Sequence, residues 1–318
     1  MIFGTSDAVT VNLADSFAQT GEGEPDAIFG FENVHYLGGT GNALLVGNAS
    51  DNALFSGMGN DTLEGGAGND FLLANSGDDM LSGGRGDDIL DGGTGTDTVS
   101  YLESVDGVRV NLAAAGPQLV SAGEGSDTLI SIENVTGSTH ADALDGNAAA
   151  NLLQGMDGND TIYGLDGNDT LTGDNGADLL QGNLGDDQLS GGAGSDDLRG
   201  GQGADTISGG GGDDRLTGAL GDDLLTGGGG ADMFIFTAGA PGAMFGHDRV
   251  NDFAAFEDML VFSQAMWRGA EGVLTAAEVV DMFASVAGDN VVFNFGDYGS
   301  VTLLGASIVG LENSLVLV

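Results

Sequence analysis

The stretch GGAGSDDLRGGQGADTIS (residues 191–208) contains two nine-residue units with the common pattern Gly-Gly-x-Gly-x-Asp-x-apolar-x. The same period continues on both sides without a slip, so that an apolar residue recurs at every ninth position from Leu153 to Phe234. An earlier series with the same period runs from Leu45 to Val99; it is called the first series, and the one from Leu153 to Phe234 the second. Self-similarity at a short fixed period is typical of solenoids, in which each repeat packs only against its neighbours. The period therefore determines the fold class.

An acidic column accompanies each apolar column. Two positions before the apolar residue, the second series has Asn151, Asp160, Asp169, Asp178, Asp187, Asp196, Asp205, Asp214, Asp223 and Asp232. The same position of the first series has Asp61, Asp70, Asp79, Asp88 and Asp97. Each unit divides into a six-residue turn, where glycine allows positive φ, and a three-residue strand whose middle side chain points inward. Two units make one coil, which predicts an all-β parallel β-roll in two tandem repeat blocks.

The rest of the chain divides around these two blocks. VTVNL and GFENV near the start recur as VRVNL and SIENV between the blocks, which indicates a duplicated lead-in. After the second block, TAAEVVDMFASVAG begins with a capping box at Thr275 and Glu278 and has apolar residues near helical spacing up to Val286. NVVFNF and VTLLG then predict a hairpin, so this end is expected to be a β-rich cap with one short helix. The predicted segments are lead-in strands 1–37, first block 38–100, inter-block strands 101–136, second block 137–235, and cap with secretion signal 236–318.

Composition limits the classes of partner. With 6 Lys and Arg against 49 Asp and Glu, the formal net charge is −43, which excludes nucleic acid and anionic membrane as partners. Apolar residues make up 41% of the chain, too many for a solvated acidic coil. Because cysteine is absent, a stabilising metal must be bound by oxygen. No apolar run reaches the length of about 18 residues that a membrane span requires, so no span is expected.

The nonapeptide, repeated in register, resembles the repeats-in-toxin (RTX) family of hemolysin-type calcium-binding proteins over residues 38–235. The resemblance implies that Ca²⁺ lies between turns on the same edge, one coil apart, where sixth-position Asp carboxylates and turn carbonyls bind it. It also implies that an interior Asp of a row bridges two ions and that a terminal Asp contacts one. The chemistry agrees, because Ca²⁺ accepts about six to eight oxygen ligands in flexible geometry, whereas Mg²⁺ requires a tight octahedron.

Carried over residue by residue, the resemblance implies four rows of ligands. The rows are Asp160, Asp178, Asp196, Asp214 and Asp232; Asp169, Asp187, Asp205 and Asp223; Asp61, Asp79 and Asp97; and Asp70 with Asp88. Because neighbouring members of a row share one ion, these rows predict about ten Ca²⁺ ions, with Asp232 at the end of its row.

Some turns depart from the pattern. Asn52 and Asn151 replace the Asp, Ala43 supplies no ligand, and the turn around Ala74 lacks its leading glycines, so sites at these turns are expected to be weak or missing. An alternative for the whole repeat is a metal-free solenoid in which Asp and Gly only form turns, but this does not explain a fixed column of like charges.

The fifth position of the turn is often Asn. We interpret these residues as solvated turn residues, with a role as extra ligands as the alternative. The examples are Asn60, Asn69, Asn159 and Asn168.

Motifs of known enzymes are absent: the sequence has no HExxH, no GxSxG and no phosphate loop, so we expect no enzyme. His35, His140 and His247 are scattered and are interpreted as structural or exposed, and Trp267 as a core residue. The pattern favours a secreted, extracellular or cell-surface calcium-binding protein with a surface, matrix or adhesion role, whose further partner is a cell surface or an extracellular polysaccharide. The alternative is the calcium-binding and secretion module of an exoenzyme, as in serralysin-like proteases or mannuronan epimerases. A catalytic β-roll acting on an acidic polysaccharide ranks last, because the sequence encodes no basic groove.

The two ends of the chain bear on export. MIFGTSDAVTVNLADSF lacks a basic segment followed by an apolar run, whereas the final LENSLVLV (residues 311–318) resembles the endings of type I secretion substrates. We therefore expect a type I secretion transporter as a partner, which reads an uncleaved C-terminal signal.

Overall fold

The computed structural model describes residues 2–3, 9–14, 17–20, 26–27, 32–36, 40–237, 245–267 and 274–318. It divides into two compact units, Met1–Asn147 and Ala148–Val318, and each is built mainly from short parallel strands. The expected all-β parallel β-roll is confirmed. The expected lead-in 1–37 and cap 236–318 are described only in part, and the side chain of Trp267 lies outside the described residues.

Unit 1 contains two ladders of parallel strands. The first ladder consists of β1 (Ile2–Phe3), β5 (Asn33–Tyr36), β7 (Ala53–Phe55), β9 (Phe71–Leu73), β11 (Ile89–Asp91) and β15 (Gly125–Ile130). The second consists of β2 (Val9–Asn12), β6 (Ala43–Val46), β8 (Thr62–Ala67), β10 (Met80–Arg85), β12 (Thr98–Ser100) and β16 (Asn134–Thr136). Further pairings add β3 (Phe17–Thr20) beside β2, β4 (Asp26–Ala27) beside β3, β14 (Gln118–Ser121) beside β15, and β13 (Arg109–Asn111) beside β17 (Ala143–Asp145).

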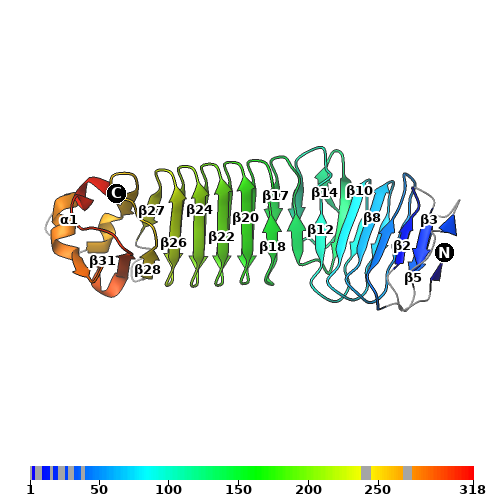
Figure 1. Cartoon of the computed structure of the whole chain (residues 1–318), viewed down its shortest axis with the longest axis horizontal. Coiled ribbons are helices and arrows are strands. Elements are labelled where there is room, and N and C mark those ends of the chain that lie inside the picture. Colours follow the sequence, from blue (N-terminus) through cyan, green and yellow to red (C-terminus); the bar gives the residue numbers. More distant parts are fainter. Residues whose placement is uncertain are drawn as a thin grey trace. The chain divides into compact units, whose positions relative to one another are not determined.

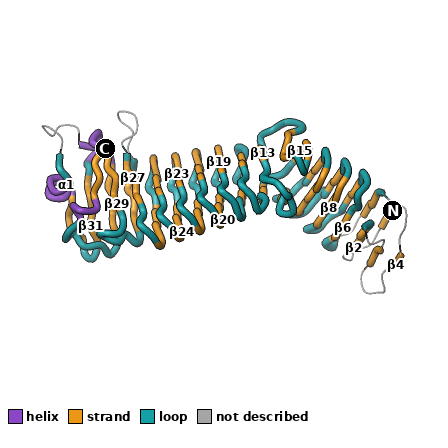
Figure 2. Tube along the Cα trace, turned by 90° about the horizontal axis from the view of Figure 1, so that it is seen from above, coloured by secondary structure: helices purple, strands orange, loops and turns teal. Residues whose placement is uncertain are grey.

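Unit 2 repeats the arrangement with greater regularity (Figure 1). One ladder contains β18 (Leu152–Gln154), β20 (Thr170–Asn175), β22 (Gln188–Ala193), β24 (Thr206–Gly211), β26 (Leu224–Gly229), β28 (Gly246–Val250) and β32 (Gly299–Leu303). The other contains β19 (Thr161–Asp166), β21 (Leu179–Leu184), β23 (Asp197–Gln202), β25 (Arg215–Leu220), β27 (Met233–Phe236), β29 (Met259–Phe262) and β33 (Leu315–Leu317). Figure 2 shows the two ladders of this unit on opposite faces of the coil.

The coil repeats every eighteen residues, as expected from two nonapeptides. Leu171 pairs with Leu189 in one ladder, and Leu180 with Leu198 in the other. The inward side chains stack along each ladder, and every apolar residue of the column from Leu153 to Phe234 is at most 3% exposed. The strands from β19 to β26 have six residues instead of the three expected, because pairing resumes beyond the first glycine of the turn, as at Asp174 with Gly192.

The C-terminal part of unit 2 continues both ladders with non-repetitive sequence. Helix α1 (Ala276–Phe283) begins at the expected capping box, in which Thr275 Oγ1 accepts the Glu278 N–H and the Glu278 carboxylate accepts the Thr275 N–H. The expected hairpin is present as β31 (Asn290–Asn294) and β32, joined through the 3-10 helix Gly296–Tyr298. Helix α1 packs against β31 and the 3-10 helix Leu311–Ser314; a further 3-10 helix spans Gln264–Trp267.

The expected apolar stripe of this helix extends too far. The chain turns to extended backbone at Ala284 (φ −86°, ψ 141°), so Val286 lies in strand β30 (Ala284–Ala287), paired with β31. Val286 is 62% exposed and Met282 is 59% exposed, whereas Val279 and Val280 are buried. The period of apolar residues resembled that of a helix because a strand of alternating residues directly follows a short helix.

Candidate metal sites

The sixth-position aspartates lie inside the turns. All fourteen of the expected ligands are at most 3% exposed. They are Asp61, Asp70, Asp79, Asp88, Asp97, Asp160, Asp169, Asp178, Asp187, Asp196, Asp205, Asp214, Asp223 and Asp232. Fully buried aspartate is rare unless it is paired or binds a metal, so the environment of each carboxylate oxygen is informative.

One oxygen of each interior carboxylate binds the neighbouring coil. Asp196 Oδ1 accepts the backbone N–H of Asp178 at 2.8 Å, and the Asp196 N–H donates in turn to Asp214 Oδ1 at 2.9 Å. The same contact, with eighteen residues between donor and acceptor, repeats along all four expected rows. The row is therefore a hydrogen-bonded chain that fixes the register of successive coils.

The second oxygen has no such partner. Oδ2 is buried and receives no hydrogen bond from the described part of the chain in eleven of these aspartates. They are Asp70, Asp79, Asp88, Asp97, Asp169, Asp178, Asp187, Asp196, Asp205, Asp214 and Asp223. An unpaired charge buried in this way costs several kcal/mol, on the order expected for one partner removed from a buried ion pair. Asp61 differs, because its Oδ2 accepts the Gly57 N–H at 3.3 Å.

All but one of these oxygens border a small hollow beside the glycine at the first position of the turn; in the turn of Asp79 that position is Ala74. A Cβ added to Gly191 would collide with Asp196 Oδ2 and would lie 2.6 Å from the carbonyl oxygen of Gly209, one coil further on. Gly164 has the same surroundings in the neighbouring row, with Asp169 Oδ2 and the Gly182 carbonyl oxygen at 3.0 Å. The hollow is thus bordered by a carboxylate oxygen of one turn and a backbone carbonyl of the next.

Burial raises the pKa of several of these carboxylates, which favours their protonated form. Desolvation, followed by the neighbouring carboxylates, raises the pKa of Asp79 to about 7 and that of Asp88 to about 8. Desolvation likewise raises the pKa of Asp205 to about 7 and that of Asp248 to about 8. A proton or a cation must compensate such groups, so a cation that binds here at neutral pH competes with a proton.

The donor set fits a calcium ion. Among the described residues, no group of three or more His, Cys, Asp or Glu side chains is arranged to hold a metal, so backbone carbonyls must supply most of the ligands. Ca²⁺ accepts mixed carboxylate and carbonyl oxygen in flexible geometry, whereas thiolate- and imidazole-dependent metals lack their ligands here. The residues that would hold the ion are the sixth-position aspartates and the first-position glycine carbonyls.

The fifth-position residues have a role that the sequence did not reveal. Asn60 Oδ1 accepts the Asp78 N–H, and Asn159 Oδ1 accepts the Ala177 N–H, both from the next coil on the same edge. Asn69 and Asn168 make the equivalent contacts at 3.1 Å. These side chains join consecutive turns by hydrogen bonds.

The rows continue beyond the repeats. In each row the last repeat aspartate donates its N–H to a carboxylate from the following, non-repetitive segment. These contacts are Asp97 to Glu133 Oε2 (2.9 Å), Asp88 to Asp127 Oδ1 (3.1 Å), Asp223 to Asp248 Oδ1 (3.1 Å) and Asp232 to Asp258 Oδ1 (3.0 Å). The chain of hydrogen bonds therefore extends one carboxylate beyond Asp232, the expected last ligand of its row. Insertions lengthen the spacing from 18 residues to 25–39 at these points, which hid the four carboxylates from a search for a fixed period.

The degenerate turns act as donors to the rows. The Ala43 N–H donates to Asp61 Oδ1 at 2.7 Å, and the Asn151 N–H to Asp169 Oδ1 at 2.8 Å. Asn52 uses its own amide within the protein, because Oδ1 accepts the Asn48 N–H at 2.7 Å and Nδ2 donates to the Glu32 carbonyl at 3.1 Å. Ala74, by contrast, is a buried apolar residue.

Each of the three histidines contacts residues of its own surroundings. The His35 ring lies 4.0 Å from that of Phe55, and His247 Nδ1 lies 2.9 Å from Ser300 Oγ. His140 neighbours Thr139 and Ser138 in the turn that precedes β17.

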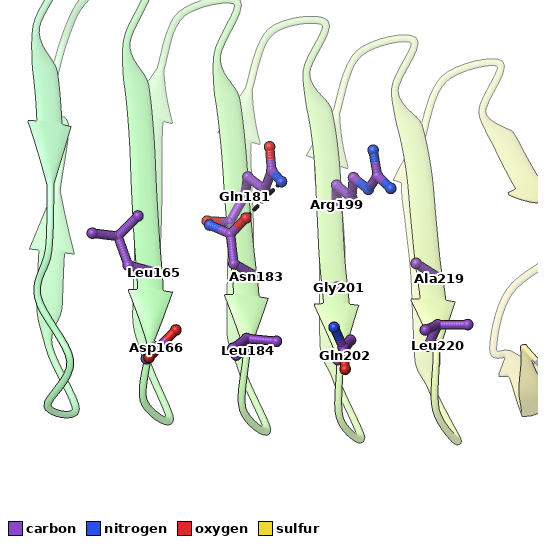
Figure 3. A pocket seen from close by; sticks show the side chains of 10 residues that line it. All are labelled: Leu165, Asp166, Gln181, Asn183, Leu184, Arg199, Gly201, Gln202, Ala219 and Leu220. Atoms are coloured by element: carbon purple, nitrogen blue, oxygen red, sulfur yellow. Dashed lines mark hydrogen bonds between the residues drawn. The ribbon is translucent and has the colours of Figure 1, made fainter. Parts of the chain in front are cut away.

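A shallow depression of about 450 Å³ lies on β19, β21, β23 and β25 (Figure 3). Gln181 Nε2 donates to Asn183 Oδ1 there at 2.7 Å. The lining consists of Leu165, Asp166, Gln181, Asn183, Leu184, Arg199, Gly201, Gln202, Ala219 and Leu220. It includes none of the fourteen aspartates, so the depression is distinct from the rows.

The RTX calcium-binding nonapeptide repeat model matches residues 37–72, 65–99, 136–171, 172–207 and 208–240, more than half of the chain. The chain belongs to the RTX family of calcium-binding nonapeptide-repeat proteins. Comparison with curated proteins finds no match. Across the described residues, no helix is long and apolar enough to cross a membrane.

Solved structures with local similarity include the extracellular lipase LipA of Serratia marcescens, at 21% identity and a TM-score of 0.27. That match covers 87% of this chain and 40% of the lipase, so the chain spans less than half the length of that protein. A second is the AlgE6R3 subunit of the Azotobacter vinelandii mannuronan C5-epimerase, at 24% identity and a TM-score of 0.19, over 56% of this chain and 79% of the subunit. The family assignment rests on the repeat model and not on these two structures.

Proposed function

We propose that this chain is a secreted calcium-binding protein whose β-roll folds when Ca²⁺ binds the aspartate rows. The observation that carries the proposal is the set of eleven buried Oδ2 atoms that receive no hydrogen bond from the described residues. Formation of the roll without metal would bury these charges uncompensated, whereas the unfolded chain leaves them in water. Calcium binding free energy is then folding free energy.

The net charge supports the same conclusion. At −43, the chain resists compaction by self-repulsion, and each Ca²⁺ cancels two negative charges. About ten ions, the number expected from the sequence, would remove about 20 charges. The ions therefore contribute both to local ligation and to the long-range electrostatics of folding.

The calcium concentration that the sites require indicates the compartment in which the chain folds. Sites of this oxygen-rich, extracellular kind bind at about 10⁻⁴ to 10⁻³ M, so the chain stays unfolded at cytosolic calcium and folds outside the cell. An unfolded chain can pass a type I secretion transporter, and LENSLVLV at residues 311–318 supports recognition of the C-terminal end. Removal of the last ~60 residues is expected to abolish secretion through a matching transporter; normal secretion of that truncation would contradict the assignment.

We assign no catalytic role to the chain, and we propose a surface, matrix or adhesion role with a cell surface or extracellular polysaccharide as partner. The alternative remains the calcium-binding and secretion module of an exoenzyme. The absence of known enzyme motifs from the sequence supports the first choice.

Circular dichroism tests calcium-dependent folding. In a chelator such as EGTA, the spectrum is expected to be largely that of an unfolded chain, and addition of about 1 mM Ca²⁺ should produce a cooperative change to β structure. Mg²⁺ at the same concentration serves as the control and should leave the spectrum unfolded. A β spectrum that persists unchanged in chelator would refute the proposal.

A further inference from the structure

The aspartate row through Asp223 continues into the C-terminal part of unit 2. Asp223 donates its backbone N–H to Asp248 Oδ1 at 3.1 Å, the contact that interior members of the rows make with each other. Asp248 lies on β28, which pairs in parallel with β26 through Leu224 and Arg249, and it is 1% exposed. Its position is therefore that of the next aspartate in the row.

Asp223 itself has a free second oxygen at this junction. Asp223 Oδ2 is buried and receives no hydrogen bond from the described residues, and a Cβ added to Gly218 would collide with it. At the start of this row the corresponding hollow also borders the next coil, through Asp169 Oδ2 and the Gly182 carbonyl. For Asp223, the next coil is the segment that carries Asp248.

The neighbouring row ends differently. Asp258 Oδ1 accepts the Asp232 N–H at 3.0 Å, but Asp258 Oδ2 accepts the Ala254 N–H at 2.7 Å. Asp252 is also used by the protein, because its two oxygens accept the N–H groups of Gly227 and Gly228 at 2.9 and 2.8 Å. Asp252 and Asp258 therefore each accept backbone hydrogen bonds at both carboxylate oxygens, and these bonds help to hold the cap in place.

Asp248 retains a binding capacity that Asp252 and Asp258 lack. Among the described residues, the only hydrogen bond to its carboxylate is the one from Asp223 to Oδ1. The buried carboxylates of Asp223 and Asp248 therefore adjoin one another, and no donor from the described part of the chain is recorded at the second oxygen of either. Such a pair repels itself unless a cation lies with it or one carboxylate takes up a proton.

We propose that Asp248 completes a further calcium site with Asp223, so that one ion joins the last repeat turn to the C-terminal cap. The proposal rests on calcium-driven folding of the repeats. It adds an ion beyond the three expected for the row that ends at Asp223, and it makes the order of the cap depend on calcium as well as on hydrogen bonds.

Two matched variants test the site. Asp248→Asn keeps an oxygen to accept the Asp223 N–H but removes the negative charge, and Asp258→Asn makes the same change at the row end that hydrogen bonds already satisfy. The number of bound ions is measured by native mass spectrometry and by calorimetric calcium titration of the full chain. We expect Asp248→Asn to bind one ion fewer than the wild type and Asp258→Asn to bind the wild-type number. Hydrogen exchange at saturating calcium should be faster at Gly246–Val250 in Asp248→Asn.

The outcomes separate this inference from the proposed function. A full complement of ions in Asp248→Asn would overturn the shared site, as would an equal loss in both variants, which would indicate detachment of the cap. Failure of the wild-type chain to bind calcium would instead refute the proposed function. If Asp248→Asn does not fold, Asp223→Asn tests the site from the repeat side: because Asp223 already shares one ion with Asp205, loss of two ions supports the site, and loss of one ion or none overturns it.

Discussion

The two repeat blocks differ in how often a protein group compensates the second carboxylate oxygen of the turn. In unit 2, seven consecutive sixth-position aspartates from Asp169 to Asp223 have a buried Oδ2 without a protein donor, whereas in unit 1 four do, from Asp70 to Asp97. Unit 1 places protein groups at the remaining turns: Gly57 donates to Asp61, and Asn52 uses its amide within the protein. Cations and protein donors are therefore alternative means of holding one backbone, and the block with more free oxygens should depend more strongly on calcium.

Among the predictions, a Gly→Ala substitution at a hollow should have the largest effect on calcium binding. In Gly191→Ala, the Cβ would occupy the space beside Asp196 Oδ2 and the Gly209 carbonyl, so at least one ion should be lost and the calcium midpoint of unit 2 should rise. Gly65→Ala places the same carbon beside Asp70 Oδ2 and the Gly83 carbonyl in unit 1. Because repeats are stabilised by their neighbours, the loss should spread further in the longer run of unit 2. Calorimetric calcium titration of both variants measures the difference.

Gly211→Ala is the matched control for this experiment. A Cβ at Gly211 has no atom within 4 Å, and its φ is not in the left-handed region, so the stability should change by less than about 0.5 kcal/mol. A full complement of ions in Gly191→Ala, or an equal change in Gly211→Ala, would show that the hollows are not the calcium sites.

The repeat made much of the fold predictable from the sequence. A nine-residue period leaves one arrangement in which every apolar residue of a column is inside, and the column from Leu45 to Val99 is indeed 0% exposed throughout. The capping box at Thr275 was equally predictable, because it depends on two residues three positions apart. Both features are local or periodic, so they are present in the sequence itself.

The groups that close the rows were not predictable in this way. Asp127, Asp248 and Asp258 reach their positions only after insertions, which remove them from the nine-residue register. In a chain with 49 Asp and Glu, a carboxylate outside the register carries no signal of its own. Pairing of the non-repetitive strands with the last coil selects these residues, and this pairing depends on tertiary structure.

The smallest expected effect concerns a place where a side-chain hydroxyl fills the role of a cation. Asp127 closes the row of Asp88, and its Oδ2 accepts the hydroxyl of the buried Tyr101 at 3.0 Å. Burial, followed by the Asp127 carboxylate, raises the pKa of Tyr101 well above its usual value, so the hydroxyl keeps its proton and remains a donor throughout the neutral range.

Tyr101→Phe removes this donor and leaves a buried carboxylate oxygen unsatisfied. The free energy of opening at Thr98–Ser100 and Gly125–Ile130, measured by hydrogen exchange at saturating calcium, should fall by about 1–3 kcal/mol. The number of bound ions should not change. Tyr163→Phe, on β19 of unit 2, provides the control and should leave the exchange of both segments as in the wild type. Unchanged exchange in Tyr101→Phe would mean that Asp127 does not need the hydroxyl, and that protein donors and cations are not interchangeable at the ends of the rows.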